Sequence, residues 1–381
     1  MTPVELSRTV LHAVRRAVDV GELSVALPER VVVTPPGAGG CGDYATNVAL
    51  QLARPAGQPA LRVADLLRAH LIGLDGIRDV AVTGPGFLNI SLREADADAG
   101  AQRLVEDILR RGERYGHGGS GVSHGVQHLR CPREPRALVH ADVVARLLRA
   151  VRPATVVRIS CVGSPPPQWE EFLEGPAGVG SGEAGGLHVP GGSLGDLPGD
   201  VVDPVDSVAP VDIRPVPVPA SAEGDLLALG RDAARWALLH PAPHDRPRIG
   251  REHLVQRESN PLFRVRYAHA RTRALLRNAA DLGFGPEPGP TDGPAARALL
   301  AVLADHPRVL GRAAEHRAPD RLARHLVDVA DAALPYLATV LPLGEEKPSA
   351  AHRARLALAE AAGTVLAGGL SLLGVDAPDH L

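Results

Sequence analysis

The chain has 381 residues and a formal net charge of −3, and 45 % of its residues are hydrophobic, so it can bury a sizeable core. Of its 41 basic residues only Lys347 is a lysine, and its neighbours Glu346 and Pro348 fit no lysine-dependent phosphate loop, which excludes P-loop nucleotide binding. The three cysteines form no CxxC pair and no apolar run approaches about 20 residues, so we expect no disulfide framework, no metal site and no membrane span. The expected location is the cytoplasm.

Residues 1–118 mix helical and strand patterns, which predicts a compact α+β domain. Gly84-Pro85-Gly86 separates two β-branched runs and is typical of a turn between strands. The segments expected to be helical are 4–20, 44–53, 61–72 and 98–111, and the expected strands are 30–34, 80–83 and 87–92.

Residues 119–225 are acidic and, in their second half, low in complexity. Nine glycines fall within residues 175–195, and residues 170–225 carry eleven acidic side chains against one arginine, Arg214. Glycine raises the entropic cost of ordering, and proline blocks the hydrogen bonds of a β-ladder. This part is therefore predicted to contain a flexible Pro/Gly-rich linker.

Residues 226–381 carry apolar residues at helical spacing, which predicts an all-α bundle. Asp320 is expected to cap its helix, and Gly368-Gly369 to end the last one. Eleven arginines against four acids between positions 231 and 277 favour a surface that faces a polyanion, or else a solvated surface on which arginine replaces lysine. The expected helices are 226–239, 261–280, 295–303, 309–317, 320–337 and 351–370.

Several strings resemble arginyl-tRNA synthetases. Residues 260–271, NPLFRVRYAHAR, resemble the NPxFYVQYAHAR segment that opens the DALR anticodon-binding domain of that family, and residues 354–381 resemble the close of the same domain. Near the other end, GDYATNVALQLA at 42–53 and GPGFLNI at 84–90 resemble the family's N-terminal domain. The resemblance implies an N-terminal α+β domain over 1–118 and a helical anticodon-binding domain over 226–381.

The segment between these two domains departs from the family. Where the family's NPTGPLHVGH signature binds ATP phosphates at a helix N-terminus, residues 131–140 read CPREPRALVH, and the paired histidines and glycines are missing. The second signature, KMSKS, cannot be formed with one lysine. Since residues 141–150 and 230–236 still resemble the family, the resemblance implies a vestigial Rossmann-like remnant and linker over 119–225. We expect no adenylation, no catalytic residues, no metal and no cofactor.

The resemblance also implies positions that contact RNA. Phe87 and Asn89 correspond to the family's contact with the tRNA D-loop; the alternative is that Phe87 is a core residue of its strand. On the helix that begins at Pro261, three arginines fall on one arc and are expected to contact anticodon-arm phosphates, unless this face is merely solvated. Tyr336 corresponds to an aromatic position for stacking on an anticodon base, whereas Tyr267 and His269 are expected to pack between helices. The three arginines are Arg266, Arg273 and Arg277.

The expected function is non-catalytic binding of tRNA, with arginine tRNA or another structured RNA as the partner and with neither DNA nor a membrane. One alternative is a protein-interaction or regulatory subunit whose RNA sites have decayed. Another is a residual ATP-dependent arginine–tRNA ligase, against which the missing signatures count.

Overall fold

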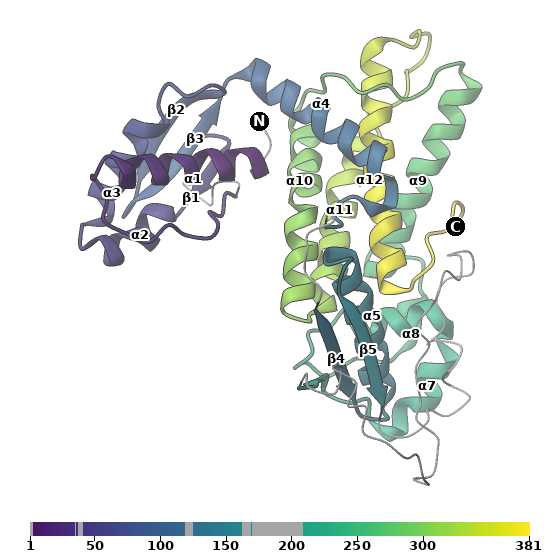
Figure 1. The fold of residues 1–381 in the computed structure, drawn as a ribbon. Helices are drawn as coiled ribbons and strands as arrows, with labels where there is room; N and C mark the ends of the chain where they lie inside the picture. The colour runs from purple at the N-terminus through teal and green to yellow at the C-terminus, as the bar shows by residue number, and fades with distance from the viewer. Residues whose placement is uncertain (1–2, 35, 37–40, 119–124, 162–168, 170–208) are drawn as a thin grey trace. The chain divides into compact units, whose positions relative to one another are not determined.

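The computed structural model describes residues 3–34, 36, 41–118, 125–161, 169 and 209–381, which belong to two compact units (Figure 1). Unit 1 contains residues 1–106 and 288–293, and unit 2 contains residues 107–287 and 294–381. The glycine-rich part of the predicted linker, residues 175–195, lies outside the described residues. The domain limits at 118 and 225 stay predictions.

Unit 1 is built on a three-stranded antiparallel sheet with the strand order β1-β3-β2. Its strands are β1 (Tyr44–Thr46), β2 (Ile77–Thr83) and β3 (Phe87–Leu92), and its helices are α1 (Pro3–Asp19), α2 (Val48–Ala56), α3 (Ala60–Leu71) and most of α4 (Glu94–Arg111). The apolar residues that recur every three or four positions in α1 and α3 form the core together with inward-facing residues of β3. Among them are Leu6, Val10, Val14, Leu67, Leu88 and Ile90.

Two predictions for unit 1 were wrong. Tyr44–Thr46 forms a strand and not the start of a helix, because it pairs with β3 in the register Tyr44 to Ile90. Residues 30–34 form no strand and contribute only an isolated bridge between Thr34 and Ala45. Both outcomes depend on pairing with segments distant in sequence, which local periodicity does not report.

Unit 2 contains a small parallel sheet with the strand order β5-β4-β6. The chain runs from β4 (Val126–Cys131) through α5 (Pro135–Val151) to β5 (Val156–Cys161), and β6 (Val211–Asp212) pairs with the other side of β4. Leu129, Cys131 and Val157 are buried, and α5 packs against β4 and β5. The alternate positions are polar: the His128 ring lies 3.0 Å from the Ser160 hydroxyl, and Arg130 pairs with Asp212 at 2.7 Å.

The rest of the described part of unit 2 is mainly helical. It comprises α7 (Glu223–Ala228), α8 (Gly230–Leu239), α9 (Pro261–Asp281), α10 (Pro294–Glu315), α11 (Pro319–Leu337) and α12 (Ala350–Leu373), with short 3-10 turns η1 (Gly112–Arg114), η3 (Ala220–Ala222) and η4 (Arg251–Leu254). The helix predicted over 226–239 is broken at Gly230, whose φ of 70° is left-handed. Helix α11 begins at Pro319, so Asp320 lies in the first turn and is not the cap.

Helix α10 is continuous over Pro294–Glu315, where two helices, 295–303 and 309–317, were predicted. Pro307 lies inside it and does not break it. Proline has no N–H group, so the carbonyl of Leu303 loses its donor four residues on. The Tyr115 hydroxyl donates to this carbonyl at 3.4 Å and compensates for the missing hydrogen bond. A side chain that precedes α10 by almost 200 residues therefore accommodates the proline.

Helix α12 does not end at Gly368-Gly369 as predicted; it continues to Leu373, and Gly374 (φ 70°) is its left-handed cap. Gly368 is needed for close packing, since a Cβ there would lie 2.5 Å from the carbonyl oxygen of Glu113. By length and composition α12 could cross a membrane, with a mean hydropathy of 1.7, although no such run was expected. In the described structure 72 % of that window is buried, as in the core helix of a folded bundle.

Candidate nucleic-acid interface

The β2–β3 hairpin of unit 1 carries the two residues expected at the D-loop, Phe87 and Asn89, and exposes only the first of them. Gly86 has a φ of 133°, and a Cβ there would lie 3.1 Å from the backbone of Ala60, so the tight turn requires glycine. Phe87 follows the turn and is 40 % exposed, which leaves its ring accessible. Asn89 is 2 % exposed and donates to the Thr83 hydroxyl at 2.6 Å, so it braces the hairpin; its contact with RNA stays a prediction.

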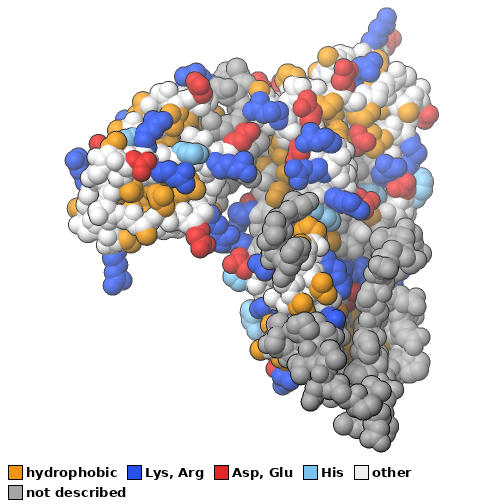
Figure 2. All heavy atoms as spheres, viewed as in Figure 1, with side chains coloured by type: hydrophobic (Ala, Val, Ile, Leu, Met, Phe, Trp, Pro, Cys, Tyr) orange, Lys and Arg blue, Asp and Glu red, His pale blue; other side chains and the backbone are white. Residues whose placement is uncertain are grey.

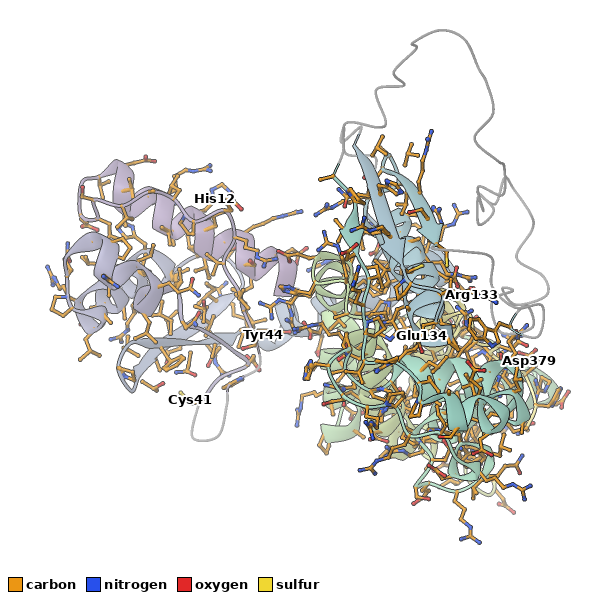
Figure 3. All side chains as sticks on the ribbon, turned by 90° about the horizontal axis from the view of Figure 1, so that it is seen from below. His12, Cys41, Tyr44, Arg133, Glu134 and Asp379 are labelled. Atoms are coloured by element: carbon orange, nitrogen blue, oxygen red, sulfur yellow. The ribbon has the colours of Figure 1, made fainter. Side chains whose placement is uncertain are left out.

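The N-terminus of α5 is where the resemblance implies a phosphate site, and a carboxylate occupies it. Glu134 is the N-cap residue: its side chain accepts the backbone N–H of Ala137 at 2.8 Å and that of Val218 at 2.8 Å (Figure 3). A helix N-terminus attracts anions because its first N–H groups lack partners. Here the chain itself supplies the anion.

Arg136, on the first turn of α5, is fully buried, and within the described residues its side chain donates to backbone carbonyls. Its guanidinium donates to five of them at 2.6–3.0 Å. Because all of these partners are neutral oxygens, the arginine fixes the chain that follows α8 and does not bind an anion. The five carbonyls belong to Val216, Leu238, Pro241, Ala242 and Asp245.

His140, the histidine that remains in this segment, is also structural. It is 1 % exposed, and burial lowers its pKa to about 4, so it is neutral at physiological pH. Its Nε2 lies 3.1 Å from the carbonyl of Leu238 and must donate, because that oxygen can only accept. Neither Arg136 nor His140 faces a phosphate site.

The arginine stripe of α9 exists, but its partners come from the same chain. Arg266 donates to the backbone carbonyl of Asp376 at 3.1 Å and forms an ion pair with Asp232. Arg273 pairs with Asp379, with 3.0 Å between Nε and Oδ1. Arg277 donates to the carbonyl of Asp379 at 3.5 Å. The stripe thus holds the segment after α12.

Tyr336 is 2 % exposed, and its hydroxyl donates to the carbonyl of Arg355 at 3.1 Å. In this position the ring packs inside the bundle, and its stacking on a base stays a prediction. His269 packs as expected, with 4 % exposure and Nδ1 lying 3.0 Å from the carbonyl of Pro378. Its pKa is lowered by burial.

Tyr267 was expected to pack, but it is 38 % exposed. It continues a line of side chains one helical turn apart: its ring is stacked on Phe263 with 5.5 Å between centroids, and the guanidinium of Arg271 lies 6.0 Å from its centroid. An exposed aromatic beside an arginine is a common platform for an unstacked base. The spacing i, i+4, i+8 could have revealed it, had the arginines at 266, 273 and 277 not dominated the pattern.

A second surface that sequence reasoning did not resolve lies between α8 and α9. Four arginines of this segment are exposed, and among the described residues no hydrogen bond or ion pair of their side chains is found. Leu254 and Val255 are exposed beside them and line a cavity of about 460 Å³ that also involves Phe263. On the face that Figure 2 shows, arginines and acidic side chains are interspersed among the atoms drawn in colour. The four arginines are Arg246, Arg248, Arg251 and Arg257.

Two family models match the chain. Residues 5–92 match "Arginyl tRNA synthetase N terminal domain", and residues 265–381 match "DALR anticodon binding domain". The two matched ranges leave out residues 93–264, which include α5 and its surroundings.

Curated relatives and solved structures agree with these models. The arginine–tRNA ligase of Renibacterium salmoninarum is 28 % identical and that of Paenarthrobacter aurescens 26 %, with all of each chain covered. The first alignment is 557 positions long, so part of the relative has no counterpart among the 381 residues. The arginyl-tRNA synthetase of Thermus thermophilus is similar in fold, with a TM-score of 0.65 at 14 % identity over all of both chains. That of Plasmodium falciparum has a TM-score of 0.64 at 9 % identity, covering 100 % of this chain and 99 % of the other.

Proposed function

The chain belongs to the arginyl-tRNA synthetase family, with its N-terminal and DALR anticodon-binding domains, and on that basis we propose that it binds tRNA without aminoacylating it. The relatives are named arginine–tRNA ligases. We propose that this chain shares their RNA partner and does not ligate arginine to it. Arginine tRNA is the first RNA to test.

The observation that carries the non-catalytic half of the proposal is the carboxylate of Glu134 at the N-terminus of α5. A class I ligase stabilises charge that develops at the α-phosphate of ATP with preorganised donors. Here the Glu134 carboxylate already accepts one N–H of that helix, from Ala137, and a second N–H from Val218, and the negative charge of a phosphate at the same place would be repelled. The single lysine supplies no second loop.

We assign the parallel unit of β4, α5 and β5 to what is left of the nucleotide-binding domain. Its connection of a strand, a helix and a parallel strand is the repeating unit of doubly wound folds. The polar contacts on its other face, of which that of Arg130 and Asp212 is exposed, support a sheet face that the described helices leave at least partly open to solvent.

For RNA binding we propose two surfaces, one in each unit. In unit 1 the exposed ring of Phe87 is available for stacking on a loop base. In unit 2 Tyr267 and Arg271 offer a stacking platform, and the partner-free arginines at 246, 248, 251 and 257 offer phosphate contacts among the described residues. The expected contacts of Arg266, Arg273 and Arg277 remain part of the proposal, once their own partners are displaced.

The first test measures binding of the purified chain to arginine tRNA and to a non-cognate tRNA across a salt series. We expect binding that weakens steeply with salt and a preference for arginine tRNA. Arginine-dependent exchange between pyrophosphate and ATP, measured on the same preparation, should be undetectable. Measurable exchange would overturn the non-catalytic half. Absence of RNA binding at low salt would overturn the other half and favour a protein-interaction role.

A further inference from the structure

The segment Asp376–Leu381, called the strap below, lies along the arginine face of α9. Successive turns of the helix contact it: Arg266 bonds the carbonyl of Asp376, His269 that of Pro378, and Arg273 the carboxylate of Asp379. Arg277 completes the row, with its Nη2 3.3 Å from Nδ1 of His380. The strap thus presents carboxylate and carbonyl oxygens to the groups that phosphate oxygens of an RNA would meet.

The two ends of the strap are held very differently. Asp376 is anchored: it pairs with Arg231, and its N–H lies 3.4 Å from a carboxylate oxygen of Asp232, which itself pairs with Arg266. The carboxylate of Asp376 is 48 % exposed, but the groups that hold this end are more buried: the side chains of Arg231, Arg266 and Asp232 are 19 %, 20 % and 16 % exposed. Farther along, the pair of Arg273 and Asp379 is 44 % and 49 % exposed.

The two ends of the strap differ in how strongly their ion pairs and hydrogen bonds hold them on α9. Exposed ion pairs are weak and are screened by salt, whereas partly buried pairs with several hydrogen bonds are stronger. Residues 376–379 form part of the wall of a cavity of about 920 Å³ that α9 and α12 also line. Because the Pro378 carbonyl bonds the buried His269, the part that can detach without leaving a buried group unpaired begins at Asp379, where the side chains are exposed.

We propose that the outer strap, residues 379–381, is a removable cover on Arg273 and Arg277, which RNA phosphates displace. This inference rests on the proposed RNA binding. In the free protein the strap satisfies the hydrogen bonds of the two arginines. An RNA must therefore supply enough phosphate contacts to replace the strap before it binds. A ligand with too few phosphates in register is thereby rejected.

The test compares two variants that each remove one negative charge from an arginine pair. Asp379→Asn weakens the cover, whereas Asp305→Asn breaks the pair of Asp305 and Arg308 on α10, away from the strap. We expect Asp379→Asn to bind arginine tRNA about three- to tenfold more tightly at low salt, and Asp305→Asn to bind like the parent. The slope of log K against log salt should steepen by about 0.7 for each phosphate gained.

A second measurement removes the outer strap. A chain that ends at Pro378 keeps the carbonyl that His269 bonds, and it should reproduce the tighter binding of Asp379→Asn.

The outcomes separate this inference from the proposed function. Tight RNA binding by the parent, with no gain in Asp379→Asn or in the shortened chain, or with an equal gain in Asp305→Asn, overturns the cover and leaves RNA binding intact. If neither the parent nor the variants bind RNA, both proposals are overturned.

Discussion

At the scale of single residues, Arg136 shows how a charged side chain serves the fold. Five carbonyl oxygens from two separate segments converge on its guanidinium, and none of them belongs to an acidic side chain. Charged hydrogen bonds of this kind are strong, and their loss leaves buried acceptors unsatisfied. The arginine thereby couples α5 to the chain on both sides of α7 and α8.

Replacing Arg136 with methionine, which keeps the length but removes the donors, should lower the free energy of unfolding of unit 2 by about 3–5 kcal/mol. Both tryptophans, Trp169 and Trp236, lie buried in unit 2, so urea unfolding followed by tryptophan fluorescence reports on it. The matched control is Arg133→Ala on an exposed neighbour, which should change stability by less than about 0.5 kcal/mol. A similar effect of both substitutions would contradict this assignment.

Buried histidines make unit 2 sensitive to acid. Burial lowers the pKa of His140, His240 and His325 to about 4, and it also lowers the pKa of His306 well below the value of about 6.5 in an unfolded chain. Below pH 6.5 these histidines are therefore protonated in the unfolded chain but stay neutral in the folded chain. The free energy of unfolding consequently falls as the pH decreases towards 4. Each such histidine costs about 1.4 kcal/mol per pH unit in that window, while none contributes a slope above pH 7.

Denaturant midpoints measured between pH 7.5 and pH 5 test this dependence. The variant His140→Gln keeps an N–H donor for Leu238 but cannot be protonated, so its stability should fall less steeply, by about one proton. His244→Gln, at an exposed position, should leave the slope unchanged. Equal slopes in all three proteins would show that His140 titrates normally.

At the scale of helices and strands, the sequence reported local patterns and missed long-range ones. The hairpin around Gly84-Pro85-Gly86 and the helices α9 and α11 were predicted because their periodicity and end signals are local. The strand Tyr44–Thr46 and the continuity of α10 were missed because each depends on a distant partner, β3 for the first and Tyr115 for the second. The candidate site divides in the same way: the exposed position of Phe87 follows from the local turn, but the acids that pair with the α9 stripe lie up to 106 residues from their arginines.

A double-mutant cycle tests the compensation at Pro307. Tyr115→Phe should cost about 0.5–1 kcal/mol of stability, because the Leu303 carbonyl loses its donor while the ring is kept. In a Pro307→Ala background the same substitution should cost almost nothing, since the new N–H of residue 307 bonds that carbonyl. Equal costs in both backgrounds would refute the compensation.

The glycines of α12 give a second test at this scale. Gly368→Ala should destabilise unit 2 by about 1–3 kcal/mol, because the new methyl group meets the backbone of Glu113, which cannot rotate away. Gly311→Ala on α10 is the matched control: no atom lies within 4 Å of its Cβ position, so helix propensity should stabilise by about 0.5–1 kcal/mol. Stabilisation by both substitutions would show that the close approach at Gly368 is dispensable.

At the scale of the whole molecule, the proposed RNA contacts lie in both units, so their contributions to binding should add. Phe87→Ala and Tyr267→Ala should each weaken binding of arginine tRNA by about 1–3 kcal/mol, and the double variant by the sum, in a complex of one chain and one tRNA. Val20→Ala and Leu343→Ala remove exposed apolar side chains elsewhere in units 1 and 2 and should bind normally. An effect of Tyr267→Ala alone would place the RNA on unit 2 only.

The buried network around Arg136 also limits how a gene for such a chain can be shortened. The loop after α8 obtains hydrogen-bond donors from α5, and α5 is further tied to α8 by the pair of Arg235 and Asp142 at 2.6 Å. A deletion that reached α5 would leave the helical unit with unsatisfied carbonyls, and the buried Arg235 would lose the carboxylate of Asp142. Loss of sequence between the two matched family domains is therefore tolerable only where it spares residues 135–151.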